Sequence, residues 1–230
     1  MKDAQHQSHQ SSDAIQHHWE SRYEQNGDQS LSWTESAQSL SQQWIRETLP
    51  RSSSIADIGA GRSMLLPALL DAGYRNLTHV EWSQSASRAL QHQLKDHASH
   101  ITWFVGDLNQ WQPPALIDLW HDRAVFHFQM DHTSIQQYLQ SLHRAVRPGG
   151  YALLATFHFN GPTKCSGLPV QRYDADTLIS TLNDYNQCRW DLLKAREWTH
   201  LTPAGTKQQF QYLLAKRASF DAEISHPQNT

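Results

Sequence analysis

The sequence predicts an α/β fold: a mostly parallel sheet with helices on both faces and an antiparallel hairpin at its C-terminal end. Short apolar segments alternate with amphipathic helical segments from residue 54 to residue 157, which is typical of a parallel sheet covered by helices. Two longer strand-like segments follow, joined by a short loop that contains Pro and Gly. Because such a loop reverses the chain, these two strands are expected to be antiparallel.

Ahead of this alternation, two helices are predicted behind a polar lead. Residues 1–13 are rich in Gln, Ser and His and have almost nothing to bury, so we expect them to be disordered. Apolar spacing and end signals predict a first helix over 13–25 and a second over 38–49, where Pro50 ends it.

The alternating part supplies most of the sheet. Gly73 occupies the position after a helix end where glycine is favoured. The segments expected to be strands are 54–58, 77–82, 101–105, 115–120 and 151–157, and the helices between them are 64–72, 85–97 and 135–146. The hairpin is expected over 189–201 and 208–216. We therefore predict a single domain over residues 14–218, followed by a flexible tail over residues 219–230.

Composition excludes several classes of protein. The formal net charge is −3 and no basic block occurs, so nucleic acid is a weak candidate partner. No segment approaches the ~20 apolar residues of a membrane-spanning helix, and residues 1–13 lack the apolar region of a signal peptide. The two cysteines, Cys165 and Cys188, suit a reducing compartment, so a cytoplasmic location is predicted.

The 15 histidines raise the question of a metal site. Several lie in the polar lead, no His-x-x-x-His pair is accompanied by a carboxylate on one helix face, and neither cysteine belongs to a Cys-x-x-Cys pair. No metal ion is therefore expected.

A glycine-containing turn follows the first predicted strand. The segment 57–63, Asp-Ile-Gly-Ala-Gly-Arg-Ser, leads from a strand into a helix, as a nucleotide-binding turn does. Glycine lets backbone N–H groups approach a ligand without interference from a Cβ atom. The third small position is Ser63 instead of Gly, which weakens the case for pyrophosphate binding.

Two carboxylates follow at the ends of the next two strands. Glu81 ends the second strand, where a carboxylate can accept both hydroxyls of a ribose. Asp107 ends the third strand, where it can accept from an exocyclic adenine amine. Each has an ordinary alternative as a polar strand end or helix cap. Three successive strand ends with groups that suit a nucleoside favour an adenosine-containing ligand.

These segments together resemble the class I S-adenosylmethionine (SAM)-dependent methyltransferases. The resemblance rests on 55–61 (IADIGAG), 79–83 (HVEWS), 105–108 (VGDL) and 147–150 (RPGG), and extends over about residues 15–216. It implies a Rossmann-like, seven-stranded sheet with an N-terminal helical lid, and SAM as cofactor with S-adenosylhomocysteine as product. The departures are Ser63 for the usual third Gly, Glu81 for the commoner Asp, and Arg62 in the turn.

The resemblance also implies roles for individual residues. Gly59, Ala60 and Gly61 would approach the amino-acid part of the cofactor with Asp57 beside it. Glu81 would hold the ribose, and the adenine would lie against Trp82. The residues that the resemblance adds to the cofactor site are Asp107 and Leu108 at the adenine edge, Trp33 in the lid, and His121.

Two further segments, 118–128 with its Trp-His-Asp-Arg sequence and 164–170, resemble a bacterial subgroup of small methyltransferases. The first follows the fourth strand, where this family places the transferred methyl group. His121, Asp122 and His127 are the candidate catalytic residues, since an imidazole can take a proton from an acceptor. The ordinary alternatives are histidines packed in the core and an Asp122–Arg123 ion pair that shapes the loop.

A set of further residues is predicted to line the acceptor pocket: Trp19, Tyr23, Arg123, Phe126, His158 and Cys165. The aromatic members near the N-terminus would exclude water and stack on the sulfonium, or serve only as core packing. Cys165 is expected to line the pocket and not to act as a nucleophile, since methyl transfer needs no covalent enzyme intermediate.

The leading hypothesis is a methyltransferase for a small-molecule acceptor, with a thiol or other sulfur nucleophile favoured because no strong base motif is visible. The nearest alternative is a protein-lysine or small-amine N-methyltransferase. An NAD-dependent oxidoreductase shares the glycine turn and Glu81 but explains neither Asp107 nor the closing hairpin. A catalytically silent binding subunit on the same fold is the third alternative. The oligomeric state is not indicated.

Overall fold

The computed structural model describes residues 2–26, 31, 39–184 and 188–219, without the side chains of residues 2–12 and 26. Contacts divide the chain into two compact units. The first, here called the N-terminal unit, comprises Met1–Trp111 and His200–Gln208, and the second, the C-terminal unit, comprises Gln112–Thr199 and Gln209–Thr230. The predicted domain limits of 14 and 218 stay a prediction.

The fold is α/β with a seven-stranded, mostly parallel sheet, as predicted. The strand order is β3-β2-β1-β4-β5-β9-β8. β1 pairs with β2, β2 with β3, and β4 with β5 in parallel, whereas β9 runs antiparallel to β5. The predicted change from parallel to antiparallel pairing at the C-terminal side is confirmed.

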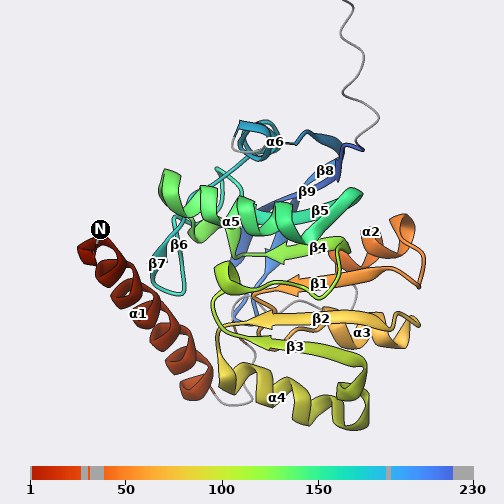
Figure 1. Cartoon of the computed structure of the whole chain (residues 1–230), viewed down its shortest axis with the longest axis horizontal. Coiled ribbons are helices and arrows are strands. Elements are labelled where there is room, and N and C mark those ends of the chain that lie inside the picture. The colour runs from red at the N-terminus through yellow and green to blue at the C-terminus, as the bar shows by residue number, and fades with distance from the viewer. Residues whose placement is uncertain (1, 27–30, 32–38, 185–187, 220–230) are drawn as a thin grey trace, which may run out of the picture. The chain divides into compact units, whose positions relative to one another are not determined.

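The N-terminal unit holds three adjacent parallel strands (Figure 1). They are β1 (Ser54–Ile58), β2 (Asn76–Glu81) and β3 (Ile101–Val105). The helices of this part are α2 (Leu40–Thr48), α3 (Leu65–Asp71) and α4 (Gln84–Leu94), with short 3-10 helices at Lys95–His100 and Leu108–Gln110. All three α-helices bury their apolar residues, which the predicted spacing requires.

Gly73 confirms its predicted role at the end of α3. Its φ is +95°, its amide donates to the carbonyl of Leu70, and the Tyr74 amide donates to the carbonyl of Leu69. This pair of bonds is a Schellman motif, which satisfies carbonyls left free at the helix end. The helix 85–97 was predicted too long, since α4 ends at Leu94 and Lys95 adopts a φ of +51°.

The first helix, α1, runs from Lys2 to Asn26 and contacts α4. It starts well before Asp13, the predicted N-cap, and includes the residues expected to form a disordered lead. Neither Gly nor Pro occurs in residues 2–13, so nothing in the local sequence ends the helix there.

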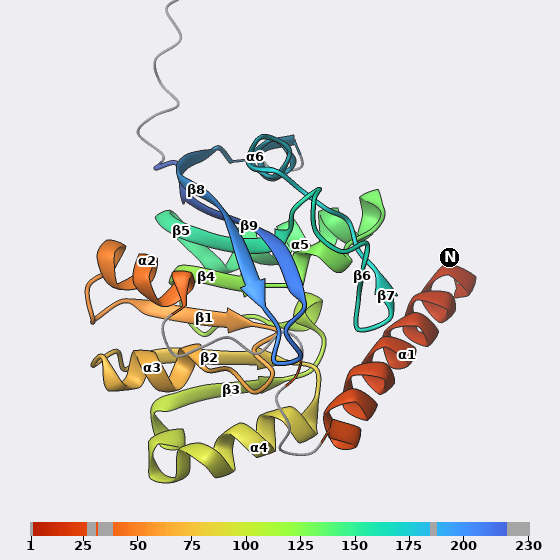
Figure 2. The same ribbon diagram turned by 180° about the vertical axis from the view of Figure 1, so that it is seen from behind.

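The C-terminal unit is built around β4 (Ile117–Arg123), β5 (Val146–Phe157), β8 (Trp190–Leu201) and β9 (Lys207–Arg217). Figure 2 shows β8 and β9 as a long hairpin beside β5. The helices are α5 (His132–Ala145), the 3-10 helix Phe126–Phe128 and α6 (Ala175–Asp184). A small separate hairpin joins β6 (Lys164–Cys165) to β7 (Leu168–Pro169).

Three boundaries in this unit differ from the prediction. β4 continues to Arg123, so His121 and Asp122 lie within the strand and not in a loop behind it. β5 begins at Val146, and the pairing with β4 shifts from Ile117↔Val146 to Leu119↔Tyr151 because the Pro-Gly-Gly segment interrupts the regular register. Helix α6 was not predicted, although Asp174 caps it by accepting the Thr177 amide at 2.8 Å.

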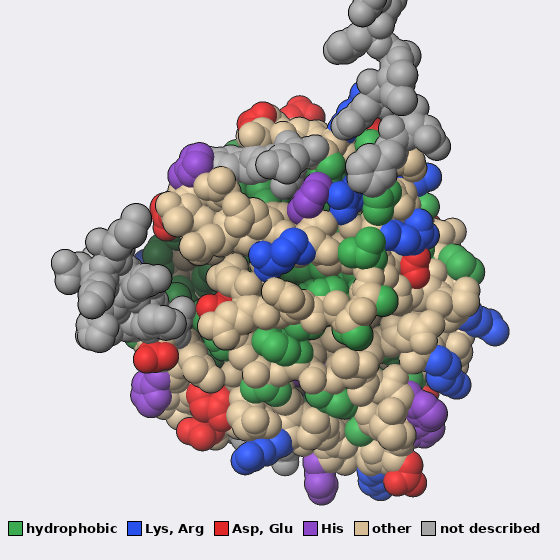
Figure 3. All heavy atoms as spheres, in the orientation of Figure 1, with side chains coloured by type: hydrophobic (Ala, Val, Ile, Leu, Met, Phe, Trp, Pro, Cys, Tyr) green, Lys and Arg blue, Asp and Glu red, His purple; other side chains and the backbone are tan. Residues whose placement is uncertain are grey.

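On the face shown in Figure 3, the Lys and Arg side chains of the described residues are spread among acidic and uncharged ones and form no continuous basic patch. None of the described helices is long and apolar enough to cross a membrane.

Candidate functional site

The glycine turn of the N-terminal unit begins where β1 ends. Gly59 and Gly61 adopt φ values of +59° and +54°, in the left-handed region that favours glycine. The Ala60 amide donates to the carbonyl of Val80 at 3.2 Å, which fastens the turn to the end of β2. The turn predicted from the sequence is therefore present, with Gly59 exposed and Gly61 buried.

The Glu81 carboxylate holds this turn together. It is buried, and Oε2 accepts the Gly61 amide at 2.7 Å while Oε1 accepts the amides of Trp82 and Ser83, each at 2.8 Å. Burial raises the pKa of the Glu81 carboxyl, and these amide hydrogen bonds counteract the rise. A carboxylate accepts about four hydrogen bonds. The three backbone amides leave Glu81 about one further acceptor position. To accept hydrogen bonds from both ribose hydroxyls, as the sequence predicts, Glu81 must therefore lose the hydrogen bond from one of these amides.

Asp57 and Ser63 form the second link across the turn. The Ser63 hydroxyl donates to Asp57 Oδ2 at 2.5 Å and accepts the amides of Leu65 and Leu66 at 3.1 and 3.3 Å. Ser63 thus satisfies two free amides at the start of α3. This explains why serine stands where the resemblance leads one to expect a third glycine.

The side chains that follow β2 and β3 are more exposed to solvent than the buried Glu81 carboxylate. Trp82, Asp107 and Leu108 are each half-buried. Asp107 Oδ1 accepts the Asn109 amide at 2.8 Å and thereby caps a short 3-10 helix, as its ordinary alternative role requires. Because β1, β2 and β3 are neighbours in register, these strand ends lie along one edge of the unit.

Helix α1 lies against the glycine turn through Tyr23. A Cβ atom placed on Gly61 would come within 2.1 Å of the Tyr23 hydroxyl oxygen, so the tyrosine occupies the space that glycine leaves. Arg62 donates to the Tyr23 carbonyl at 2.9 Å and lies over its ring, and the Ser85 amide donates to Glu20 at 3.0 Å. Trp19 is half-buried, whereas Trp33 lies outside the described residues.

Sequence reasoning missed His79 in this unit. Its side chain is fully buried on β2, with Nε2 3.0 Å from the carbonyl of Gly61 and its ring against Trp103. Burial lowers the pKa of His79, so the neutral ring donates to that carbonyl. No signal in the sequence indicated this role, because His79 comes beside Asp57 only through the pairing of β1 with β2.

In the C-terminal unit, Asp122 is the centre of a buried hydrogen-bond cluster. Oδ1 accepts the Val125 amide at 2.8 Å, Oδ2 accepts the Phe126 amide at 2.9 Å, and Tyr138 of α5 donates its hydroxyl to Oδ2. Burial raises the pKa of Asp122 to about 6 in spite of these donors. The cluster fixes the turn after β4, in which Ala124 has a φ of +72°.

The alternative of an Asp122–Arg123 ion pair is wrong. Successive residues of a strand point to opposite faces, and Arg123 instead donates to the Tyr212 hydroxyl at 3.2 Å and lies over the Phe210 ring. Phe126, predicted for the acceptor pocket, is fully buried between Tyr138 and Tyr173. Its predicted place in an acceptor pocket stays a prediction.

His127 is fully buried after this turn. Its Nδ1 accepts the Phe157 amide at 3.4 Å, and its carbonyl accepts the Gln171 amide at 2.8 Å. Burial, followed by the positive charge of Arg123, lowers the pKa of His127 to about 3. The ring is therefore neutral at physiological pH, and because Nδ1 accepts the Phe157 amide, the proton lies on Nε2.

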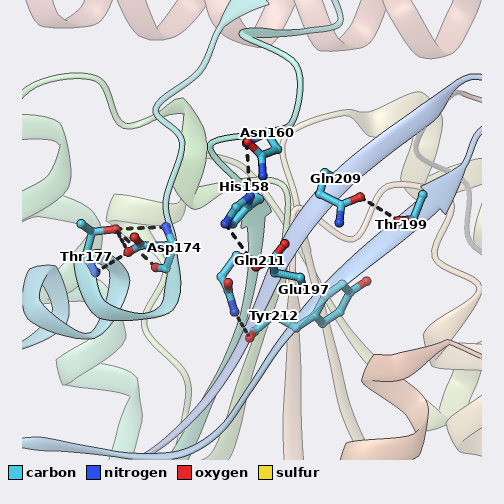
Figure 4. Close-up of polar contacts among 9 residues, drawn as sticks. All are labelled: His158, Asn160, Asp174, Thr177, Glu197, Thr199, Gln209, Gln211 and Tyr212. Atoms are coloured by element: carbon cyan, nitrogen blue, oxygen red, sulfur yellow. Dashed lines mark hydrogen bonds and ion pairs between the residues drawn. The ribbon is translucent and has the colours of Figure 1, made fainter.

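His158, beyond the end of β5, is held in a similar way (Figure 4). Its Nδ1 accepts the Asn160 amide at 3.2 Å, and its Nε2 faces Glu197 of β8 at 3.7 Å. Glu197 had not been predicted, because its proximity depends on the long hairpin returning to the end of β5. Cys165 is buried in the β6–β7 hairpin, and His121 is buried on β4 opposite Leu153.

The described residues thus bring together Asp57, Gly59, Gly61 and Glu81 in one unit, and Asp122, Arg123 and His127 in the other. The proposed catalytic roles, and the contact of His121 with the cofactor, stay predictions. Within the described part of the chain, no group of three or more His, Cys, Asp or Glu side chains is placed to hold a metal ion.

Comparison with known proteins agrees with this fold. Residues 55–150 match a family model described as a methyltransferase domain. A 1,6-didemethyltoxoflavin N1-methyltransferase from Burkholderia thailandensis, solved with S-adenosylhomocysteine, is similar at a TM-score of 0.72 and 17% identity, with 92% of this chain and 90% of that chain covered. No curated protein matches the sequence.

Two other solved structures are similar over most of their length. A SAM-dependent methyltransferase from Methanosarcina mazei has a TM-score of 0.62 at 16% identity, with 76% of this chain and 97% of that chain covered. The glycopeptide N-methyltransferase MtfA, solved with SAM, has a TM-score of 0.60 at 14% identity, with 81% and 95% covered. Residues 55–150 are thus similar to a methyltransferase domain, and the fold of the chain is similar to that of these methyltransferases.

Proposed function

We propose that this enzyme transfers a methyl group from SAM to a small-molecule acceptor, with a thiol or other sulfur nucleophile as the first candidate. The observation that carries the donor assignment is the edge formed by the ends of β1, β2 and β3. There the glycine turn, Glu81 and Asp107 follow three adjacent parallel strands. Methyltransferases of similar fold have been solved with SAM or its product.

The described residues fit an adenosine-containing cofactor. Asp107 keeps Oδ2 without a hydrogen bond among the described residues, and Trp82, which follows β2, is half-buried. Exposed Gly59 offers a backbone approach without a Cβ atom. Glu81 fits with its one remaining acceptor position, which a ribose hydroxyl can use. We therefore assign Asp57, Gly59, Ala60, Gly61, Glu81, Trp82, Asp107 and Leu108 to this cofactor.

SAM, when bound, supplies a methyl group that its sulfonium has already activated. The lone pair of the acceptor forms the new bond to the methyl carbon, and the electron pair of the broken carbon–sulfur bond stays on sulfur. The protein must then orient the acceptor and exclude water. His127 and His158 both have Nδ1 engaged by a backbone amide, which leaves neither set up as a base. An acceptor that reaches the enzyme with an available lone pair at neutral pH, such as a thiolate, needs no such base.

Isothermal calorimetry tests this proposal. S-Adenosylhomocysteine is expected to bind to the purified chain, and methyl-labelled SAM is expected to transfer label to small thiols. Binding of NAD with no response to S-adenosylhomocysteine would return the chain to the oxidoreductase alternative. The two cysteines, which form no disulfide with each other, also lead us to expect action in a reducing compartment.

A small-amine or protein-lysine N-methyltransferase is the second candidate. The observation that favours it is that two similar structures are titled N-methyltransferases. Transfer of label to amines or to a protein fraction, and not to thiols, would select this candidate over the first.

A further inference from the structure

Both the amide and the carbonyl of Gly61, in the glycine turn, are held by side chains of the same strand. The amide donates to Glu81 Oε2 at 2.7 Å, and the carbonyl lies 3.0 Å from His79 Nε2. His79 and Glu81 are two residues apart on β2, so their side chains leave the same face of the sheet. The Ala60 amide donates to the carbonyl of Val80, which stands between them in the sequence. Three successive residues of β2 therefore fasten the turn.

The hydrogen bond from His79 is fixed by burial and packing. The side chain is fully buried, and its ring lies against Trp103 of β3 at 4.7 Å between centroids. Burial lowers the pKa of His79, so the ring is neutral, and because a carbonyl can only accept, Nε2 carries the proton. Since Gly61 is also buried, removing this donor is expected to leave its carbonyl unsatisfied and to shift the turn.

The two side chains that hold Gly61 differ in what else they must do. In the proposed function Glu81 accepts a ribose hydroxyl, for which its three backbone amides leave about one acceptor position. The buried Nε2–H of His79 is directed at the Gly61 carbonyl and holds Gly61 independently of Glu81. The turn can therefore stay attached to β2 while Glu81 exchanges a backbone amide for a ribose hydroxyl.

The order of the strands indicates which part of the cofactor the turn faces. β1, β2 and β3 are neighbours, and the proposed function places the ribose at Glu81, which ends β2, and the adenine at Asp107, which follows β3. The sulfonium and amino-acid part of SAM, on the other side of the ribose, then lie at the end of β1. There Gly59 is exposed, whereas Gly61 is buried with its amide and its carbonyl both engaged. Gly61 thus anchors the turn, and Gly59 is the position open to a ligand.

We infer that His79 is a positioning residue for the cofactor: by holding the Gly61 carbonyl, it fixes the glycine turn in the conformation that binds the amino-acid part of SAM. This inference rests on the proposed function, because it concerns the donor site of the same methyl transfer. In this role His79 acts through Gly61 and needs no contact with the cofactor. A turn that is fixed before binding costs the ligand little reorganisation, so the hydrogen bond from His79 contributes to affinity.

A pair of ligands separates this positioning role from a general contribution to folding. S-Adenosylhomocysteine contains the adenosine and the amino-acid part, whereas 5′-methylthioadenosine contains the adenosine and the thioether without the amino-acid part. A displaced glycine turn weakens binding of the first ligand selectively. A side chain that only stabilises the fold has no such preference between them.

Two variants of His79 and one control are compared by calorimetry and thermal unfolding. His79→Phe keeps a ring against Trp103 but has no donor. His79→Gln places an amide N–H near the position of Nε2. Leu77→Ala, at a buried position near the start of β2, is the control that loses stability without changing a contact of the turn.

The expected results differ between the variants. His79→Phe is expected to bind S-adenosylhomocysteine about tenfold more weakly than the wild type and to keep its affinity for 5′-methylthioadenosine. His79→Gln is expected to recover part of the lost affinity, because it restores a donor to the Gly61 carbonyl. Leu77→Ala is expected to have a lower Tm and, below that Tm, the affinities of the wild type for both ligands.

Equal losses of affinity for both ligands in His79→Phe, or no loss for either, would overturn the inference. If His79→Phe does not fold, His79→Asn, whose amide is too short to reach the Gly61 carbonyl, takes its place. Failure of both variants to fold would make His79 a residue of the core alone and would also overturn it. If the wild type does not bind S-adenosylhomocysteine, the proposed function itself fails. If the wild type binds it and the variants show no selective loss, only the role of His79 fails.

Discussion

The Glu81 carboxylate accepts the amide of Gly61 at 2.7 Å, so the acidic residue at the end of β2 holds the glycine turn that follows β1. One residue thus serves the structure of the turn and, in the proposed function, the ribose of the cofactor. The longer side chain of Glu makes this reach possible, which gives a physical reason for Glu where the resemblance leads one to expect Asp.

We expect Glu81→Gln to weaken both the fold and cofactor binding. Its amide nitrogen cannot accept the backbone N–H groups that the carboxylate oxygens accept. Leaving a buried donor unsatisfied costs about 1–3 kcal/mol. Thermal unfolding should show a lower Tm, and calorimetry a weaker affinity for S-adenosylhomocysteine. Glu47→Gln, on the exposed side of α2, should change neither. An unaltered Tm for Glu81→Gln would show that these hydrogen bonds contribute little.

Gly61→Ala should displace α1 from the glycine turn. The added methyl group would lie 2.1 Å from the Tyr23 hydroxyl oxygen, and the φ of +54° is unfavourable for alanine. Gly205→Ala has a φ of +80° but nothing within 4 Å, so it reports the backbone strain alone, roughly 1 kcal/mol. We expect the Gly61 variant to lose more stability than the Gly205 variant, and Tyr23→Ala to restore part of the difference. Equal losses would contradict the described contact.

Asp122 should make the fold less stable as pH rises. Its pKa is raised to about 6 from an ordinary value of 3.8, so the folded chain keeps a proton that the unfolded chain releases. The stabilisation is complete below about pH 4 and is lost as pH rises to about 6. At 1.36 kcal/mol per pH unit the loss is on the order of 3 kcal/mol. Urea unfolding should show wild type losing stability relative to Asp122→Asn over this range. Parallel profiles would contradict the prediction.

His127 should make the fold less stable as pH falls. Its pKa falls from 6.5 to about 3, so the unfolded chain binds a proton that the folded chain excludes. The stabilisation is complete above about pH 6.5 and is lost as pH falls toward about 3. His127→Asn removes this dependence, so the wild type should lose more stability than the variant on acidification. If acid destabilises both equally, His127 is not buried as a neutral ring.

Much of the fold could be predicted because local signals agreed with the tertiary structure. Gly73 ends α3 as predicted, and the Pro-Gly loop reverses the chain between β8 and β9. The signals that were overlooked are also local: Asp174 and Thr177 cap α6, and residues 2–13 contain no helix breaker. Boundaries were less accurate because a strand such as β4 continues as long as its neighbour β5 pairs with it.

The sequence predicted which residues lie at the candidate site better than it predicted the contacts that they make. Sequence order placed Glu81 and Asp107 at strand ends correctly, but it could not show that Glu81 turns back to the Gly61 amide. The partners of Asp122 and His158, Tyr138 and Glu197, come from distant parts of the chain. Such contacts depend on tertiary packing, which residue spacing does not encode. The resemblance to the subgroup with the Trp-His-Asp-Arg sequence stays a prediction.

The affinity of Asp107→Asn for S-adenosylhomocysteine, measured by calorimetry, tests most directly whether the ends of β1, β2 and β3 bind the cofactor. Asparagine can still cap the short helix through its side-chain oxygen, but its NH₂ group opposes the adenine amine. We predict that the wild type binds and that Asp107→Asn binds about tenfold or more weakly at an unchanged Tm, with Asp96→Asn, at an exposed aspartate, like the wild type. Equal affinity of Asp107→Asn and the wild type, or no binding by either, would contradict this assignment.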